Sequence, residues 1–166
     1  PCRPKTPTLP SGDANAVSKG FHDIRILCRK STPIMLHMPA PQRFRHAAIV
    51  GKPQAQGMRE LLEDVARFLT QQGLEVCLER ATAQATGITQ YDALEAAQLG
   101  QRCDVTVVVG GDGTMLGIAR ELAQFDMPLI GINQGRLGFI TDIPLAQMEA
   151  TLGAMLAGRY VVERST

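Results

Sequence analysis

Residues 107–114 read VVVGGDGT, an apolar run that passes directly into glycines around a single aspartate. The longer run DVTVVV, residues 104–109, is rich in β-branched side chains. Such a run is typical of a strand that is buried on both faces of a sheet. The glycines at 110–113 are followed by a helical pattern over residues 114–124, so they occupy a strand-to-helix turn. This stretch predicts one β–α unit of an α/β domain.

The remainder of residues 44–166 repeats this alternation of strand and helix. Short apolar or alternating runs end at glycine or proline, and between them apolar residues recur at intervals of three and four. Predicted strands are 46–51, 74–79, 104–109, 128–132 and one that starts at 160–162; predicted helices are 58–69, 91–99, 114–124 and 145–155, with a loop at 81–89. Short connections between such units imply right-handed crossovers. We therefore predict an α/β fold with an open, mostly parallel sheet flanked by helices.

The composition excludes several classes of function. The chain has 166 residues, a net charge of +1 and 45% hydrophobic residues, without an apolar run long enough to cross a membrane. Neither nucleic acid nor membrane binding has electrostatic support. The four cysteines, at 2, 28, 77 and 103, form no CxxC pair, which favours reduced thiols in a cytoplasmic protein, with Cys77 and Cys103 as packing residues. The histidines at 22, 37 and 46 lack the spacing of a metal or acid–base site.

Residues 1–43 differ in composition from the rest of the chain. They hold seven of the ten prolines, and seven basic residues against two acidic ones. Such a lead is typical of a disordered segment, and a flexible extension or a weak transit-type presequence are two interpretations. We favour a third, a misassigned start, because the chain begins with Pro1 while Met35 or Met38 stands just ahead of the first predicted strand.

The glycine turn predicts phosphate chemistry. Glycines permit positive φ and close approach of a ligand, and the amides at the start of a helix point at anionic oxygens with the helix dipole behind them. A bare phosphate would repel Asp112, so this carboxylate should face either a hydroxyl that loses a proton or a Mg²⁺ that bridges phosphates. Both roles belong to phosphoryl transfer to an alcohol. The alternative is that Asp112 only caps a helix that opens at Thr114.

Two well-known nucleotide-binding motifs do not match. The spacing Gly111-x-Gly113-x-x-x-Gly117 misses the dinucleotide motif GxGxxG by one residue, and no GK[ST] follows for a P-loop.

A second glycine cluster, GINQGRLGFITD at 131–142, follows the next predicted strand. It should lie beside the first cluster if the two strands are neighbours, at the edge of the sheet where ligands of α/β proteins bind. Phe139 can stack on an adenine or pack on the core. Asn133 can bind the ligand or stabilise its own turn, and Arg136 can meet a phosphate or lie in solvent.

These two segments together resemble a known family. VVVGGDGTML (107–116) followed by PLIGINQGRLGFITDI (128–143) is similar to the NAD kinases, the bacterial type in particular, and residues 44–164 resemble their Rossmann-like N-terminal domain. The resemblance implies transfer of a phosphoryl group from ATP to the 2′-hydroxyl of the adenosine ribose of NAD+, with a divalent cation, Mg²⁺. It also implies a homodimer or homotetramer.

The resemblance assigns roles to individual residues. Asp112 stands where the family has the aspartate near the 2′-hydroxyl, its proposed proton acceptor, and Gly113 lies beside it. No metal ligand is assigned, and Gly117 replaces a larger or basic residue of many relatives. The remaining predicted nucleotide-binding residues are Gly111, Thr114, Leu116, Asn133, Phe139 and Ile140, with Phe139 near the adenine.

The resemblance covers one domain only. NAD kinases continue into an all-β domain with an Asn-Glu motif, and no Asn-Glu pair occurs in the 166 residues. We therefore expect a fragment with little activity on its own. A lipid or sugar kinase with the same GGDGT motif and a nucleotide-binding module without catalysis are the alternatives. The loops that follow GGDGT in diacylglycerol kinases and phosphofructokinases are absent from the sequence, which disfavours the first alternative.

Overall fold

The structure is a computed structural model that describes residues 25–28, 44–136, 138, 140–141 and 143–164. The strands are β1 Arg25–Cys28, β2 His46–Gly51, β3 Glu75–Glu79, β4 Asp92–Leu94, β5 Val105–Gly110, β6 Leu129–Asn133, β7 Ile143–Pro144 and β8 Val161–Arg164. The helices are α1 Met58–Gln71, α2 Arg80–Thr86, α3 Ala96–Arg102, α4 Asp112–Leu122 and α5 Met148–Leu156, with short 3₁₀ turns η1 Ala123–Phe125 and η2 Leu145–Gln147.

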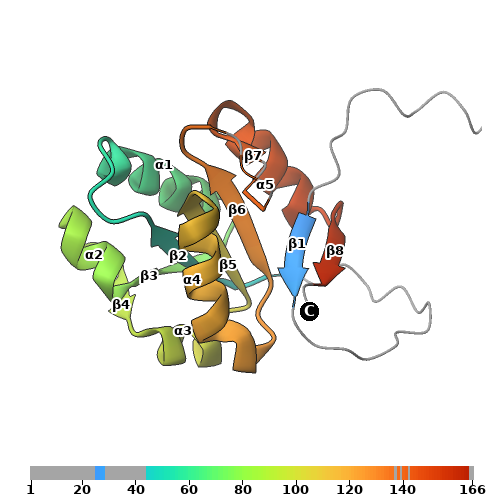
Figure 1. The fold of residues 1–166 in the computed structure, drawn as a ribbon, viewed down its shortest axis with the longest axis horizontal. Coiled ribbons are helices and arrows are strands. Elements are labelled where there is room, and N and C mark those ends of the chain that lie inside the picture. The colour runs from blue at the N-terminus through green and yellow to red at the C-terminus, as the bar shows by residue number, and fades with distance from the viewer. Residues whose placement is uncertain (1–24, 29–43, 137, 139, 142, 165–166) are drawn as a thin grey trace, which may run out of the picture.

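One sheet organises the domain (Figure 1). Its order is β4-β3-β2-β5-β6-β1-β8, and β7 pairs with β6 beyond the end of the β1 pairing. Among the described pairs only β1 with β6 is antiparallel, and the others are parallel. This arrangement confirms the predicted α/β fold with an open, mostly parallel sheet.

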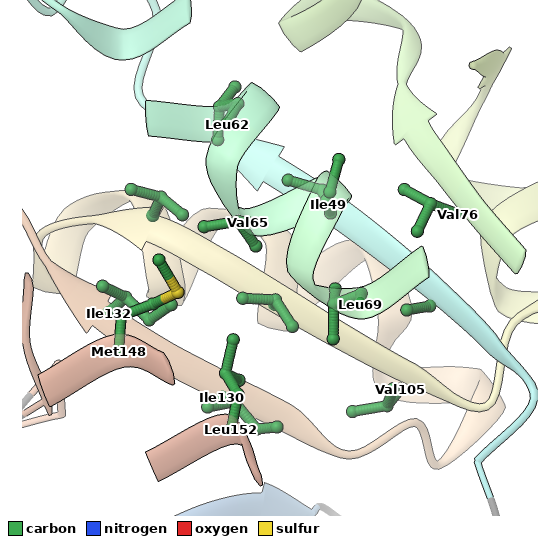
Figure 2. Packing of buried hydrophobic residues seen from close by; sticks show 14 of the residues in the cluster. Ile49, Leu62, Val65, Leu69, Val76, Val105, Ile130, Ile132, Met148 and Leu152 are labelled. Atoms are coloured by element: carbon green, nitrogen blue, oxygen red, sulfur yellow. The ribbon is translucent and has the colours of Figure 1, made fainter. Parts of the chain in front are cut away.

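The central strands are buried on both faces, as their continuous apolar runs predict. In β2, Ala47 and Ile49 face one core cluster while Ala48 and Val50 face the other. Helices α1 and α5 cover the first face, and α3 and α4 cover the second. Figure 2 shows the first cluster. Its labelled members are Leu62, Val65 and Leu69 from α1, Met148 and Leu152 from α5, and Ile49, Val76, Val105, Ile130 and Ile132 from the strands.

The two predicted packing cysteines belong to the core. Cys77 and Cys103 are buried free thiols of the second cluster. Burial raises the pKa of the Cys103 thiol to about 12, with the neighbouring Cys77 thiol adding to the effect. Both thiols therefore stay protonated and unreactive at neutral pH.

Two local predictions were wrong. Residues 81–89 do not form a loop, because α2 occupies Arg80–Thr86 and ends at Gly87 in the left-handed conformation. This helix buries only Thr82 and Ala83, so it leaves almost no apolar period in the sequence. The predicted helix at 91–99 begins instead as β4, which pairs with β3 at the sheet edge, and α3 starts only at Ala96. A pairing that depends on a distant strand carries little local signal.

The lead also contains an element that was not predicted. Arg25–Cys28 form β1, which pairs with β6 at Leu27 and Leu129 and runs parallel to β8. The remainder of 1–43, with both candidate start methionines, lies outside the described residues. Within the part of the chain that the structure describes, no helix has the length and apolarity needed to cross a membrane.

The strand order places a switch point between β2 and β5. The chain leaves β2 through α1 toward β3 and β4, and it leaves β5 through α4 toward β6 on the other side. Helices α1 and α4 then cover opposite faces of the sheet. In open α/β sheets, ligands bind at the carboxyl ends of the strands beside such a switch point. The segments that follow β2, β5 and β6 all begin at this edge: residues 52–57, Gly111 and residues 134–136.

At the amino ends of the strands, Asp104 links β2 to β5. Its Oδ2 accepts hydrogen bonds from the backbone N–H groups of Arg45 at 2.7 Å and His46 at 2.9 Å, so it joins the starts of β2 and β5. Partial burial by itself raises the pKa of the Asp104 carboxyl. The hydrogen bonds from the two N–H groups lower the pKa by more than burial raises it, so the net pKa lies below the ordinary value.

We expect this carboxylate to make stability dependent on pH in the acid range. Because its pKa is lower in the folded state, its contribution is complete above the unfolded value of roughly 3.9 and is lost as pH falls through the folded value. At pH 7 the variant Asp104→Asn should lower the free energy of unfolding by about 1 kcal/mol. Urea unfolding at pH 7 and pH 3 should show this difference shrinking with acid.

The matched control is Asp64→Asn, which removes the same charge from an exposed ion pair with Arg67 on α1. Exposed pairs contribute little, so this variant should stay near the wild type at pH 7. A difference between wild type and Asp104→Asn that grows as pH falls would contradict the assigned role.

Candidate functional site

The glycine turn joins the end of β5 to the start of α4. Gly111 is the N-cap residue in an extended conformation, with φ −128° and ψ −174°. The first helical hydrogen bond runs from Met115 N to Gly111 O at 3.1 Å. The amides ahead of Met115 therefore lie in the first turn, where helix N–H groups lack intrahelical partners and favour anions.

Asp112 is the first residue of α4, so the alternative that it only caps a helix opening at Thr114 is wrong. The helix opens two residues earlier than the predicted start at Thr114, and Gly111 takes the cap position without a side-chain bond.

The glycines of the turn differ in what surrounds them. A Cβ on Gly110 would lie 2.9 Å from Thr114 Oγ1 and 3.2 Å from Lys52 Cβ, whereas one on Gly111 or Gly113 would meet nothing within 4 Å. None of these three glycines has a positive φ. Gly110 is therefore closely packed against Thr114 and Lys52, with no room for a side chain. Gly111 and Gly113 border open space.

That open surface continues along α4. Gly113, Leu116 and Gly117 follow helical spacing and are exposed, and Leu116 is 42% exposed. A Cβ on Gly117 would also meet nothing within 4 Å. These three residues form an exposed strip on α4 in which only the leucine carries a side chain.

The second glycine cluster lies directly beside the first. Gly110 pairs with Asn133 in the register of β5 and β6, and Gln134 N donates to Gly110 O at 2.9 Å. This confirms that the two clusters meet at one edge of the sheet.

Asp112 connects the turn to the second cluster. Its Oδ1 accepts hydrogen bonds from Ile140 N at 3.2 Å, Thr141 N at 3.0 Å and Thr141 Oγ1 at 3.0 Å. Gly138 approaches the same carboxylate, since a Cβ at this position would overlap Oδ1 and lie 2.7 Å from Cγ. The carboxylate is thus held by the loop that follows β6.

Asn133 takes part in the same network. Its side chain is 4% exposed, and Nδ2 donates to Thr141 O at 3.1 Å and to Thr141 Oγ1 at 3.0 Å. Among the described residues its buried Oδ1 has no hydrogen-bond partner. In this structure Asn133 stabilises its own loop.

The other predicted residues are placed as follows. Ile140 contacts Asp112 through its backbone, and its partly buried side chain packs against the second core cluster. Thr114 is the third residue of α4 and so lies in its first turn, and Arg136 is exposed. Phe139 lies outside the described residues.

Some residues at this edge were not singled out from the sequence. The exposed Lys52 follows β2, and its backbone N donates to Val109 O at 2.9 Å beside the glycine turn. Gln134 Nε2 donates to Gln56 O at 3.1 Å and so joins the loops after β2 and β6. Thr141 supplies two donors to Asp112. Only the position of Lys52, Gln134 and Thr141 in the sequence could have pointed to them, because each follows a strand whose carboxyl end lies at this edge of the sheet.

Comparisons with known proteins identify the family of this chain. Residues 47–160 match the profile of the ATP-NAD kinase N-terminal domain. The chain is 62% identical over 124 residues to the NAD kinase of Methylibium petroleiphilum, which covers 75% of this chain and 41% of that protein. It is 59% identical over 122 residues to the NAD kinase of Polaromonas naphthalenivorans, with 74% and 42% covered.

A solved structure shows the same fold. The crystal structure of yeast NADH kinase complexed with NADH superposes with a TM-score of 0.62 at 17% identity, covering 71% of this chain and 39% of that one. The chain spans about two fifths of the length of the curated relatives. Because the family profile matches more than half of its residues, the chain belongs to the ATP-NAD kinase family, through the N-terminal domain.

Proposed function

We propose that the protein containing this domain is an NAD kinase that transfers the γ-phosphoryl group of ATP to the 2′-hydroxyl of the adenosine ribose of NAD+. The observation that carries this proposal is the carboxylate of Asp112. It lies at the N-terminus of α4 and is held there by the backbone of Ile140 and Thr141, within a chain of this family. An acceptor of protons and a set of anion-binding amides therefore share one turn.

The proposed reaction uses this turn in a simple way. The 2′-oxygen forms a bond to the γ-phosphorus, the bond from that phosphorus to the oxygen of ADP breaks, and ADP leaves. Asp112 accepts the proton of the hydroxyl as the bond forms. The amides at the start of α4 orient the phosphates, and positioning with electrostatic stabilisation supplies most of the rate in phosphoryl transfer.

The exposed strip on α4 suits the nucleoside. Leu116 lies between the side-chain-free surfaces of Gly113 and Gly117. A purine ring or ribose can therefore contact the backbone of α4 directly, with apolar contact from the leucine. We infer that Gly111, Gly113, Thr114 and Leu116 contact the nucleotide. Asn133 at the end of β6 and Phe139 and Ile140 beyond it complete the inferred set.

The donor set fits a magnesium ion that is bound together with the nucleotide. Among the described residues no group of three or more His, Cys, Asp or Glu side chains is arranged to hold a metal. Mg²⁺ commonly binds through substrate phosphates and waters, so in this proposal the cation would be held on the nucleotide phosphates beside the first turn of α4, and Asp112 stays the proton acceptor. Bound there, the cation would neutralise charge on the transferred phosphoryl group.

Two further properties belong to the proposal. We place the protein in the cytoplasm, supported by the dispersed cysteines, of which Cys77 and Cys103 are free thiols. We also propose a homodimer or homotetramer for the whole protein, which light scattering of the full-length protein would test.

The first test is formation of NADP+ from ATP, NAD+ and Mg²⁺ by the longest natural polypeptide that contains this domain. We expect turnover by that protein and little or none by the 166-residue chain, which spans about two fifths of its relatives. The mass of the endogenous polypeptide identifies the form to assay. A full-length protein that binds both nucleotides without forming NADP+ would refute the proposed activity and favour a binding module.

A further inference from the structure

Thr141 is the residue through which the loop after β6 holds Asp112. It is fully buried, with 0% exposed surface, although it lies in a loop. Two of the three hydrogen bonds described for Asp112 Oδ1 come from Thr141, one from its backbone N and one from its hydroxyl. A buried polar side chain in a loop needs a partner, and here that partner is the carboxylate of the proposed reaction.

The direction of the hydrogen bonds follows from the chemistry of the groups. An ionised carboxylate only accepts, so the Thr141 hydroxyl donates to Asp112 Oδ1 at 3.0 Å. The same hydroxyl oxygen accepts from Asn133 Nδ2 at 3.0 Å, and Asn133 is the last residue of β6. A directed chain therefore runs from the sheet through the hydroxyl to the carboxylate.

Packing holds the threonine in place from the other side. A Cβ on Gly131 would lie 2.8 Å from Thr141 Cγ2 and 3.0 Å from Thr141 Cα, so the threonine rests directly on the backbone of β6. The methyl group thus packs against the sheet while the hydroxyl faces Asp112. These are separate roles of the two branches of one side chain.

We propose that Thr141 is a positioning residue, whose hydroxyl fixes the orientation of the Asp112 carboxylate for phosphoryl transfer. This inference rests on the proposed kinase function. Charge-assisted hydrogen bonds to a carboxylate are the stronger ones in proteins, and they restrict where the accepting oxygens point. Loss of the hydroxyl should therefore affect the chemical step more than the binding of nucleotides.

The test compares four full-length proteins, in which the hydroxyl and the methyl group of residue 141 are removed separately or together. Wild type and Thr141→Val share the methyl group, and Thr141→Ser and Thr141→Ala both lack it. In each pair we expect loss of the hydroxyl to lower kcat by roughly ten- to a hundredfold, with KM for NAD+ within a few-fold. The serine variant should keep most of the wild-type kcat. Thermal unfolding of all four proteins accompanies the kinetics.

A matched control is Thr106→Val. Thr106 is also fully buried, and its hydroxyl donates to Met127 Sδ at the opposite edge of the sheet. We expect this variant to retain the wild-type kcat even if its melting temperature falls. Stability loss alone would then be separated from loss of positioning.

Each outcome decides between the two proposals. Turnover by wild type with unchanged kcat in both hydroxyl-free variants would overturn the role of Thr141 and leave the kinase function standing. Equal loss of kcat in the serine and alanine variants would also overturn it, because packing alone would then explain the effect. A wild-type protein that forms no NADP+ refutes the kinase function and this role with it. If the valine variant does not fold, the serine and alanine pair still decides.

Discussion

Asp112→Asn in the full-length protein is expected to lower kcat for NADP+ formation by roughly 10²- to 10⁴-fold, the range that one general acid–base group contributes. Asparagine keeps an oxygen at Oδ1, so the bonds from Ile140 N and Thr141 N can persist and the loop should stay in place. The amide does not accept the proton of the 2′-hydroxyl at neutral pH. The loss should therefore appear in turnover, measured by NADP+ formation, while nucleotide affinity measured by calorimetry changes little.

Asp126→Asn is the matched control for this change. Asp126 directly follows η1 with a φ of 54°, a conformation that asparagine tolerates well. It precedes β6, so it lies at the opposite end of the strands from the glycine turn. This variant should turn over like the wild type. Near wild-type kcat in Asp112→Asn would contradict the role of Asp112 and favour a function in binding alone.

Gly138→Ala is expected to reduce turnover by roughly a hundredfold, as does a displacement of about 1 Å in a reacting group. A methyl at this position would overlap Asp112 Oδ1 and lie 2.7 Å from Cγ and 2.8 Å from Oδ2. Either the carboxylate or the loop must move to relieve the overlap. Each movement strains the hydrogen bonds from Ile140 and Thr141. Steady-state kinetics on the full-length protein measure the effect.

The control for this substitution is Gly153→Ala in α5. A Cβ there would lie 3.8 Å from Phe68 Cζ, an ordinary contact, and alanine favours a helix over glycine. Its activity should equal that of the wild type, with stability unchanged or raised by up to about 1 kcal/mol. Equal activity in Gly138→Ala and Gly153→Ala would show that the close approach to Asp112 is not required for catalysis.

Much of the fold could be predicted because its signals are local. The run of valines in β5 and the apolar period of α1 indicate directly which residues are buried. Side chains alternate between the two faces of a strand and return to the same face of a helix every three to four residues. The elements that sequence reasoning missed have weak local signals. α2 buries two residues, β4 pairs only at an edge, and β1 depends on distant partners in β6 and β8.

The candidate site also has features that could be predicted from local sequence and features that depend on distant contacts. The glycine turn and the second glycine cluster were visible as motifs, and their adjacency followed from neighbouring parallel strands. Thr141 belongs to the second glycine cluster, but nothing in the sequence indicated that it contacts Asp112. Its contact with Asp112 spans 29 positions in the sequence, and only the return of the loop over β6 at Gly131 brings the two together.

The order of residues along this chain was enough to predict an α/β domain with a glycine turn around Asp112, because strand burial and glycine turns depend on neighbouring residues. The orientation of that carboxylate depends on folding. The chain Asn133–Thr141–Asp112 exists because the sheet sets β5 beside β6 in register, and hydrogen bonds require distances that sequence separation does not determine.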